Sequence, residues 1–223
     1  MAIEKDLFRL VMSQFASGVA VVTTHNSEGR LAGLTVNAFA SVSLEPPLVL
    51  ICIDLHSHVL ASLRTSGTFV VNILTSEQEH LSRCFASSSQ ERYEHFCHAS
   101  YYTAATGSPV LDDTLAFIDT RIVAEYPGGD HAIFLGQVIA MGTHSQVAFA
   151  TEAGEQHCNL LDYESNGTNG AKPYPSPDKK WPLVYYRSQY RHLAPDYQRP
   201  SLVEDRQSRV QLITAVPSRE SKM

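Results

Sequence analysis

"TVNAFASVSLEPPLVLICIDLHS", residues 35–57, joins two stretches of opposite character. Alternate side chains of a strand share a face. Four hydrogen-bonding side chains therefore lie together if the first stretch is extended: Thr35, Asn37, Ser41 and Ser43. The second stretch, residues 48–53, is apolar at every position, which is typical of a strand buried on both faces. Because Pro46 and Pro47 break the chain between them, the sequence predicts a polar strand beside a buried strand.

Short strand patterns continue on both sides of this pair. The predicted strands are residues 18–24, 31–43, 48–53, 68–74, 115–126, 132–141 and a last strand within 182–193. Turn clusters separate them, notably "HNSEGR" around Gly29 and "PGGDH" at residues 127–131. Many short antiparallel strands with few helices predict a mainly β protein built on a β-barrel.

Three short helices are predicted beside these strands. Apolar residues recur at helical spacing through residues 1–15, which predicts an amphipathic helix packed on the strands that follow. Ser57 can cap a second helix, which Gly67 can end. Ser76 and Glu79 have the spacing of a capping box and open a third helix.

The composition favours a soluble globular protein with a small-molecule ligand. The 223 residues carry a net charge of -6, and no stripe of Lys and Arg offers the positive surface that nucleic-acid phosphates require. No apolar run is long enough to cross a bilayer, and the amino terminus carries acids where a signal peptide has a basic start. We therefore expect a cytoplasmic protein with neither nucleic acid nor membrane as a partner.

The four cysteines predict free thiols rather than disulfides, because no CxxC pair is present and a reducing compartment is expected. Cys52 lies within the apolar strand and is expected in the core. His95, Cys97 and His98 come together in "EHFCHAS", which raises a zinc site as the alternative. Structural zinc sites usually need two separated ligand pairs, so no metal is expected.

The carboxyl-terminal part contains two polar segments. Residues 142–181 are predicted as a loop-like insertion within a domain of residues 1–193, and residues 194–223 as a polar tail. The tail ends in Ser221-Lys222-Met223, which differs from the peroxisomal address S-K-L only in its last side chain. A peroxisomal location is therefore the alternative to the cytoplasm.

The order of the motifs resembles a known family. Six segments carry the resemblance: "FASGVAVVTT", "GLTVNAFASVSLEPPLVLICID", "FVVNIL", "RCFA", "GDHAIFLGQV" and "PLVYYRSQYRHL". Together they are similar to the flavin reductase-like family over roughly residues 8–140 and 182–193. The resemblance implies a Greek-key split β-barrel with short flanking helices, a homodimer, and hydride transfer from NADH or NADPH to FMN or FAD. Several members of this family supply reduced flavin to a partner monooxygenase.

The resemblance also implies a flavin site. Flavin needs apolar walls for its ring and hydrogen-bonding groups for its polar edge. The matching motifs place eight residues at the flavin: Thr35, Asn37, Ala38, Ser41, Asp54, Ser57, Arg83 and Phe85. Ser57 would meet the phosphate at a helix start, where free N–H groups favour an anion, and Arg83 would add positive charge. Family members often carry a Thr where this chain has Val59, which removes one donor.

The "GDH" motif places His131 beside the nicotinamide as the catalytic residue. Hydride transfer needs little acid or base chemistry from the protein, because the cofactors carry it. We therefore expect His131 to orient the nicotinamide or to influence flavin protonation. No GxGxxG motif follows a strand, which agrees with nicotinamide binding across the flavin rather than on a Rossmann unit.

Each interpretation has a plainer alternative. The polar face can simply face water, Ser57 can be an ordinary helix cap, and His131 can be a turn residue. Two other functions also stay open: an oxidoreductase that keeps its FMN and acts on an organic, secondary-metabolite-like substrate, and a non-catalytic flavin- or haem-binding barrel. The visible spectrum of the purified protein, followed by NADH titration, separates the three functions.

Overall fold

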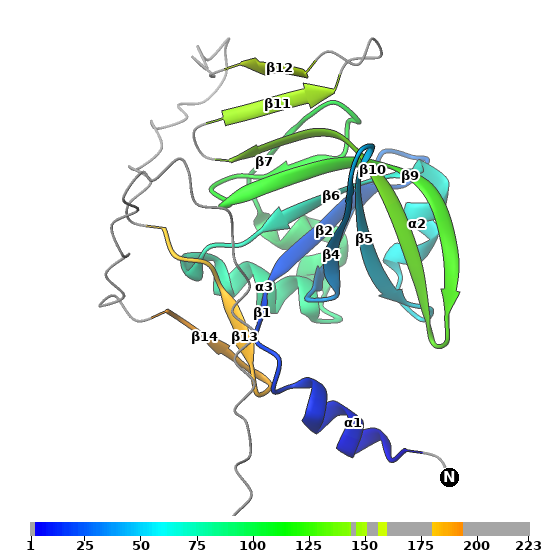
Figure 1. Cartoon of the computed structure of the whole chain (residues 1–223). Helices are drawn as coiled ribbons and strands as arrows, with labels where there is room; N and C mark the ends of the chain where they lie inside the picture. Colours follow the sequence, from blue (N-terminus) through cyan, green and yellow to red (C-terminus); the bar gives the residue numbers. More distant parts are fainter. Residues whose placement is uncertain (1–2, 144–145, 151–155, 160–179, 194–223) are drawn as a thin grey trace, which may run out of the picture. The chain divides into compact units, whose positions relative to one another are not determined.

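The computed structural model describes residues 3–143, 146–150, 156–159 and 180–193, and this part of the protein is mainly β (Figure 1). Its strands are β1 (Ser17–Gly18), β2 (Ala20–His25), β3 (Leu31–Val36), β4 (Phe39–Leu44), β5 (Pro47–Asp54), β6 (Thr68–Ile73), β7 (Tyr101–Thr103), β8 (Pro109–Leu111), β9 (Ala116–Gly128), β10 (His131–Thr143), β11 (Gln146–Ala150), β12 (Gln156–Asn159), β13 (Val184–Tyr186) and β14 (Gln189–Arg191). Its helices are α1 (Lys5–Met12), α2 (Val59–Ser66), α3 (Glu79–Ala86) and α4 (Gln90–His95), with 3₁₀ turns η1 (Ser76–Gln78) and η2 (Phe96–His98). The predicted fold class, mainly β with short flanking helices, is confirmed.

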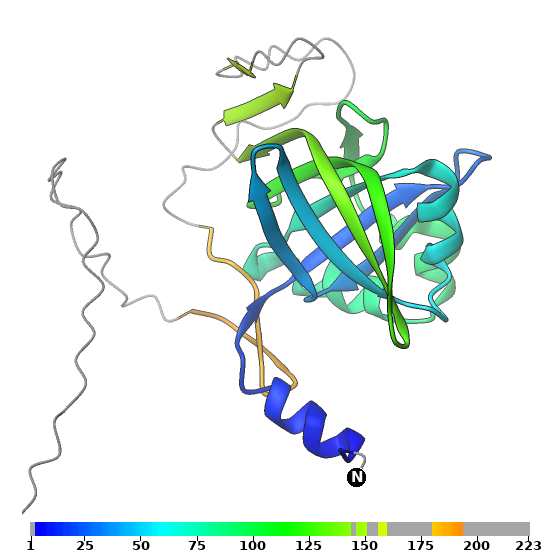
Figure 2. The same ribbon diagram turned by 45° about the vertical axis from the view of Figure 1, so that its right-hand side comes forward.

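Strand β10 connects the other strands into a curved antiparallel sheet. It pairs with β9 along one edge, while β5 pairs with residues 131–137 and β11 with residues 140–143. The sheet continues from β9 through β6 and β2 to β3, and β4 pairs with β5. Between β3 and β4 the chain bends at Asn37 and Ala38, where the Cys52 N–H donates to the Ala38 carbonyl (3.1 Å). The sheet thus curls into a barrel (Figure 2), and the predicted strand 31–43 is two strands.

Strand β5 alternates between the barrel interior and its outer face. Its buried residues are Val49, Ile51 and Ile53, and its half-buried residues are Leu48, Leu50 and Cys52. The rings of Phe69 and Phe134 fill the interior beside the buried row. The prediction that residues 48–53 are buried on both faces, with Cys52 in the core, is therefore wrong. An apolar strand can place one face on the surface when another group covers it.

A second apolar cluster lies between the sheet and helix α3. Phe85 is fully buried and packs edge-to-face on Phe96, with ring centroids 5.1 Å apart. Gly33 of β3 makes room for Phe85, because a Cβ at this position would lie 2.5 Å from a ring carbon. Burial of a Phe side chain contributes about 1.5–3 kcal/mol. This contact therefore anchors α3 to β3.

Helix α1 forms within the predicted segment, but it packs differently. Within the described part of the chain, none of its residues is buried. Its apolar side chains are 53% to 61% exposed: Leu7, Phe8, Leu10, Val11 and Met12. The prediction that this helix packs on the following strands is wrong for the single chain. A continuous apolar helix face in water indicates a contact with another molecule.

A capping box opens η1, the 3₁₀ turn before α3, and it lies one residue before the predicted pair. The Thr75 N–H donates to Oε1 of Gln78 (3.1 Å), and the Thr75 side chain accepts from the Gln78 backbone. Gln78 Nε2 also donates to the Asp112 carbonyl (2.8 Å). The predicted pair, Ser76 and Glu79, does not form the box because the η1 turn delays the α-helix to Glu79.

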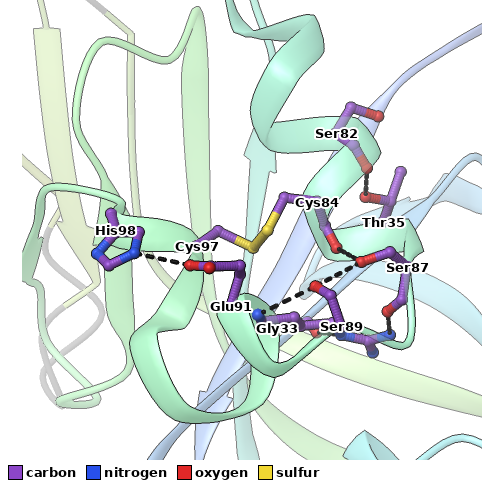
Figure 3. Close-up of a disulfide and its surroundings, with 10 residues drawn as sticks. Gly33, Thr35, Ser82, Cys84, Ser87, Ser89, Glu91, Cys97 and His98 are labelled. Atoms are coloured by element: carbon purple, nitrogen blue, oxygen red, sulfur yellow. Dashed lines mark hydrogen bonds and ion pairs between the residues drawn. A yellow bond between two sulfur atoms is a disulfide. The ribbon is translucent and has the colours of Figure 1, made fainter.

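A disulfide joins Cys84, near the end of α3, to Cys97 in η2 (Figure 3). The prediction of free thiols is wrong for this pair, whereas Cys52 is a free thiol. Because its sulfur is bonded to Cys84, Cys97 has no thiolate to offer zinc. His98, its neighbour, lies 2.7 Å from a carboxylate oxygen of Glu91. The disulfide ties the end of α3 to a segment, residues 87–98, that contains α4.

Strands β11 and β12 fall within the predicted loop-like insertion, residues 142–181. β11 pairs with β10, and β12 pairs with β11. This part of the range is therefore extended chain paired into the sheet rather than loop. Residues 160–179 and the predicted tail, 194–223, lie outside the described residues. In the part that the structure describes, no helix is long and apolar enough to span a bilayer.

Candidate functional site

The bend between β3 and β4 presents polar groups to solvent. Asn37 and Ala38 lie between the strands and are exposed, as is Ser41 in β4. Within the described part of the chain, the side chains of Asn37 and Ser41 have no hydrogen-bond partner. Ser43 differs, because its hydroxyl bonds the backbone of Glu45 (3.2 Å). Asn37 and Ser41 therefore keep their donors and acceptors available to a ligand.

Thr35 ties β3 to helix α3. Its hydroxyl donates to the Ser82 carbonyl (2.7 Å), and the residue is half-buried. The Ser82 hydroxyl in turn lies 2.8 Å from the Tyr190 hydroxyl of β14. The Thr35 proton is thus committed within the protein. In this structure Thr35 positions α3 and β14, and only its oxygen lone pairs remain to meet a ligand.

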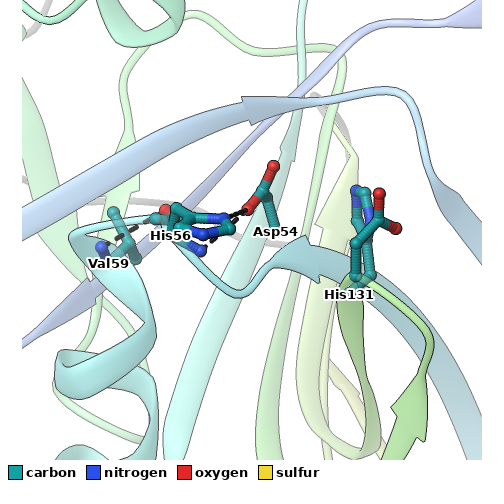
Figure 4. A network of polar contacts seen from close by, with 6 residues as sticks. Asp54, His56, Val59 and His131 are labelled. Carbon is teal, nitrogen blue, oxygen red and sulfur yellow. Dashed lines mark hydrogen bonds and ion pairs between the residues drawn. The ribbon is translucent and has the colours of Figure 1, made fainter.

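The end of β5 meets the start of β10 in a polar cluster (Figure 4). Asp54 and His131 are directly paired residues of these strands. The His56 N–H donates to Asp54 (2.7 Å), and His56 Nδ1 lies 3.0 Å from the same oxygen. The backbone bond first, and then the two imidazoles, lower the pKa of Asp54. His131 Nδ1 lies 2.8 Å from Asp130 Oδ1, and this bond lowers the pKa of Asp130. Both carboxyl groups are therefore ionised at neutral pH.

His131 has one committed ring nitrogen and one available ring nitrogen. An ionised carboxylate only accepts, so Nδ1 carries the proton that faces Asp130. In the neutral ring, Nε2 is then a hydrogen-bond acceptor. The side chain is 41% exposed at the mouth of the β9–β10 hairpin. His131 can therefore accept a hydrogen bond from a bound molecule.

Helix α2 begins close to this cluster, and its second N–H, that of Leu60, donates to the Ser57 carbonyl (3.1 Å). It starts at Val59 with His58 as its N-cap, so Ser57 is not the N-cap residue that was predicted. The Ser57 hydroxyl still accepts the Val59 N–H (3.3 Å), and the Ser57 N–H donates to the Asp54 carbonyl (2.9 Å). No acidic side chain lies in the first turn. The helix start therefore suits an anion such as a phosphate. Gly67 ends the helix in the left-handed conformation, as predicted.

Arg83 and Phe85 occupy different environments on α3. The Arg83 guanidinium pairs with Glu79 (2.6 Å) and lies 4.7 Å from the centre of the Tyr190 ring. Arg83 is exposed and lines an open hollow of about 500 Å³ with four residues of the β13–β14 hairpin: Tyr185, Ser188, Gln189 and Tyr190. Phe85 is fully buried, so the structure presents no Phe85 surface to a ligand. Phe85 can support the site only through α3.

The hairpin residues around this hollow are not assigned by the motifs. Tyr190 contacts both Ser82 and Arg83, and its ring meets Tyr185 edge-on at 5.4 Å. The aromatic and basic segment "YYRSQYRHL" carries a signal for such a surface. Its place beside α3 could not be predicted, because it depends on the pairing of β1 with β13 across about 165 residues.

An apolar surface adjoins the polar cluster, and together they fit a flavin. Cross-strand pairs on the outer face of β5 and β10 are Leu50 with Leu135, Cys52 with Ile133, and Asp54 with His131. The apolar row thus runs directly into the polar cluster. The Cys52 N–H, within the apolar row, donates to the Ala38 carbonyl. A flat ring system with a polar edge needs such a wall with hydrogen-bonding groups at its rim. The start of α2 supplies the place for a phosphate.

Comparisons with known proteins identify the family. The model of the flavin reductase like domain matches residues 12–194. The reductase subunit HsaB of a flavin-dependent monooxygenase from Rhodococcus jostii is 31% identical over 195 residues, which cover 87% of this chain and 81% of that protein. A flavin reductase (NADH) from Kitasatospora aureofaciens is 37% identical over 146 residues, 65% of this chain and 75% of that protein.

A solved structure agrees with these relatives. The NADH:FAD oxidoreductase SgcE6 from Streptomyces globisporus C-1027, in complex with NAD and FAD fragments, has a TM-score of 0.65 and 28% identity, and the match covers 87% of this chain and 95% of that chain. The chain therefore belongs to the flavin reductase-like family. It is an NAD(P)H:flavin oxidoreductase, with flavin and a reduced nicotinamide as its cofactors.

Proposed function

We propose that the flavin binds along the outer face of β5 and β10, between the β3–β4 bend and the start of α2. The observation that carries this proposal is the Asp54–His131 pair at the end of an apolar strand pair, beside the unpartnered side chains of Asn37 and Ser41. When bound, the flavin accepts a hydride from the reduced nicotinamide, chemistry that the two cofactors supply themselves. The protein's task is to hold and orient them.

The chain's residues divide this task among them. Asn37 and Ser41 donate and accept hydrogen bonds at the polar edge of the ring, and the small side chain of Ala38 leaves the bend open. Ser57 and the positive end of the α2 helix dipole hold the phosphate, while Asp54 fixes the loop before α2 through the His56 N–H. Thr35, Arg83 and Phe85 act through the position of α3, with Arg83 as a positive group at its exposed face.

His131 is proposed to orient the nicotinamide. With its Nδ1 proton held by Asp130, the neutral ring can accept the carboxamide N–H of the nicotinamide at Nε2. This role needs no proton transfer in the hydride step. It also agrees with the position of His131 at the mouth of a hairpin, where a second molecule can enter.

The reduced flavin is proposed to leave for a partner monooxygenase. The Rhodococcus jostii relative, itself a reductase subunit of such an enzyme, supports this role. The proposed assembly is a homodimer, supported by the exposed apolar face of α1 and by Leu44, which is 95% exposed at the end of β4. A second copy of the chain can cover both surfaces.

Steady-state oxidation of NADH and of NADPH, each with FMN and with FAD, tests the assigned activity and its cofactor preference. We expect turnover of added free flavin. We also expect flavin to bind weakly enough for the reduced form to dissociate. Tight retention of FMN without turnover of free flavin would contradict the proposed supply of reduced flavin and favour action on an organic substrate. Absence of both flavin binding and nicotinamide oxidation would contradict the whole proposal.

A further inference from the structure

We infer that Cys84 and Cys97 form a redox site, oxidised by hydrogen peroxide, whose disulfide holds residues 87–98 against the flavin-binding region. This inference rests on the proposed function for two things: the flavin site, and the release of reduced flavin, from which the peroxide forms. The disulfide and the contacts of the segment belong to the structure. The inference adds a reversible modification site to an enzyme whose hydride chemistry needs no cysteine.

The disulfide lies where small reagents can reach it. Both cysteines are half-buried rather than enclosed in the core. Cys97 lies in a run of three residues with left-handed backbone, Phe96, Cys97 and His98, at φ 50°, 55° and 50°. Such a conformation is uncommon for residues with side chains and persists where the surroundings fix it. The turn at Cys97 therefore depends on the contacts around it, of which the disulfide is one.

The segment touches the proposed flavin site at two points. Tyr93 of α4 packs edge-on against the His58 ring, with centroids 5.2 Å apart, and His58 is the N-cap of α2. Arg92 is buried and donates to the carbonyls of Gly33 (2.9 Å) and Ser87 (2.8 Å). A shift of the segment therefore moves both the helix start that suits the phosphate and the strand that leads to the β3–β4 bend.

Reduction loosens this arrangement without abolishing it. The two Arg92 hydrogen bonds and the Ser89 cap of α4 do not depend on the sulfurs. At the far end of the segment, the crosslink adds a covalent bond to α3 (Figure 3), beside the packing of Phe96 on Phe85. Oxidised and reduced proteins are thus two folded states that differ in how firmly residues 87–98 hold His58. We expect the oxidised state to bind flavin more tightly.

The oxidant in this step is hydrogen peroxide, which forms from the reduced flavin that the enzyme releases. Free reduced flavin passes two electrons and two protons to dioxygen, which yields hydrogen peroxide and oxidised flavin. One cysteine thiolate attacks a peroxide oxygen, which breaks the O–O bond and gives a sulfenic acid and, after protonation, water. The second thiolate attacks the sulfenic sulfur, the S–O bond breaks, and the disulfide and another water form. Two thiols and one peroxide thus give one disulfide and two waters.

We expect the disulfide to slow NAD(P)H oxidation when no acceptor uses the reduced flavin. When no acceptor takes up the reduced flavin, peroxide accumulates and oxidises the pair. Tighter flavin binding then slows product release and the formation of further peroxide. A cellular dithiol reductant would restore the loose state once peroxide falls.

The test uses the full chain, first reduced with dithiothreitol and then treated with hydrogen peroxide, so that no turnover is required. Intact mass after thiol blocking should show one new disulfide in wild type and in the control Cys52→Ser, and none in Cys84→Ser/Cys97→Ser. Hydrogen exchange without flavin should show faster exchange across residues 87–98 in the reduced protein. Flavin titration should show a dissociation constant at least about fivefold larger in the reduced protein, the low end of typical coupling between sites.

Reduced wild type carries no substitution, so its behaviour decides the matter even if the double variant folds poorly. Failure of peroxide to form the Cys84–Cys97 bond would overturn the inference. So would a bond that forms but leaves both the exchange of residues 87–98 and the flavin dissociation constant unchanged. A protein that forms the bond and protects the segment but binds no flavin would instead sink the proposed function, because the mass and exchange measurements need no flavin.

Discussion

Asn37 offers the sharpest single-residue test of the flavin site. Asn37→Ala removes donors and acceptors that are unused within the described part of the chain, so folding should be unaffected. If the amide bonds the flavin, its loss should weaken binding by about 1–3 kcal/mol. Fluorescence titration measures the dissociation constant. Ser43→Ala is the matched control, because that hydroxyl bonds its own loop. Equal affinities in the two variants would place the flavin elsewhere.

His131 and Asp130 should affect the nicotinamide more than the flavin. His131→Ala should raise the KM for NADH and slow flavin reduction in stopped-flow experiments, with little change in flavin affinity. Asp130→Asn removes the carboxylate that holds the Nδ1 proton, so the ring should lose its tautomer preference and show a smaller effect of the same kind. If reduction proceeded at the wild-type rate in His131→Ala, the role proposed for the histidine would be wrong.

Asp119 predicts a pH dependence of stability. Burial raises its pKa, against hydrogen bonds from Thr106 that lower it. A carboxyl group with a raised pKa in the folded state stabilises the protein fully below its ordinary pKa, near about pH 4. This contribution is lost as the pH rises through the raised value. Urea unfolding from pH 4 to 7 should therefore show wild type losing free energy of unfolding relative to Asp119→Asn. The exposed control Asp6→Asn should not reproduce this difference.

At the scale of elements, the contact of Gly33 with Phe85 joins β3 to α3. In Gly33→Ala the new Cβ would lie 2.5 Å from the buried ring, so the ring and α3 must shift. Overpacking of this kind costs about 1–3 kcal/mol, which the urea midpoint would report. Gly18→Ala meets no atom within 4 Å and is the control. Equal loss in both variants would show that backbone entropy rather than the Phe85 contact sets the cost.

Elements with a local signal could be predicted from the sequence. The β9–β10 hairpin follows from β-branched residues around "PGGDH", and Gly67 ends α2 because it can adopt a left-handed backbone. The bend at Asn37 and Ala38 has no such signal, since closure of the barrel onto Cys52 imposes it. The Cys84–Cys97 bond likewise depends on how α4 packs, which spacing does not show.

The same division applies to the candidate site. The motif resemblance indicated His131, Asp54 and Ser57, which backbone contacts bring together. It also indicated Phe85, whose burial only the packing of α3 on Gly33 could reveal. Tertiary contacts also decide which polar groups already form hydrogen bonds within the protein, and the Thr35 hydroxyl is one of them.

At the scale of the whole molecule, the exposed face of α1 predicts self-association. Leu10→Glu places a charge on this face, where an apolar contact with a second copy would have to bury it. Sedimentation velocity should show wild type as a dimer and Leu10→Glu shifted to monomer, with an unchanged circular dichroism spectrum. Lys5→Glu, on the same helix, is the charge control. A monomeric wild type would contradict the proposed homodimer.

Strand β10 limits where this chain can change its length. It begins at His131 and pairs with β11 at its other end. Strand β9 pairs along its length on one edge, and β5 pairs with residues 131–137 on the other edge. One inserted residue within a strand turns all the side chains on one side of it to the opposite face. An insertion between His131 and Gly142 would therefore misplace either the imidazole proposed to orient the nicotinamide or the pairing with β11. Natural or engineered additions should be tolerated beyond Thr143, where they leave the register of β10 with β5 and β9 unchanged.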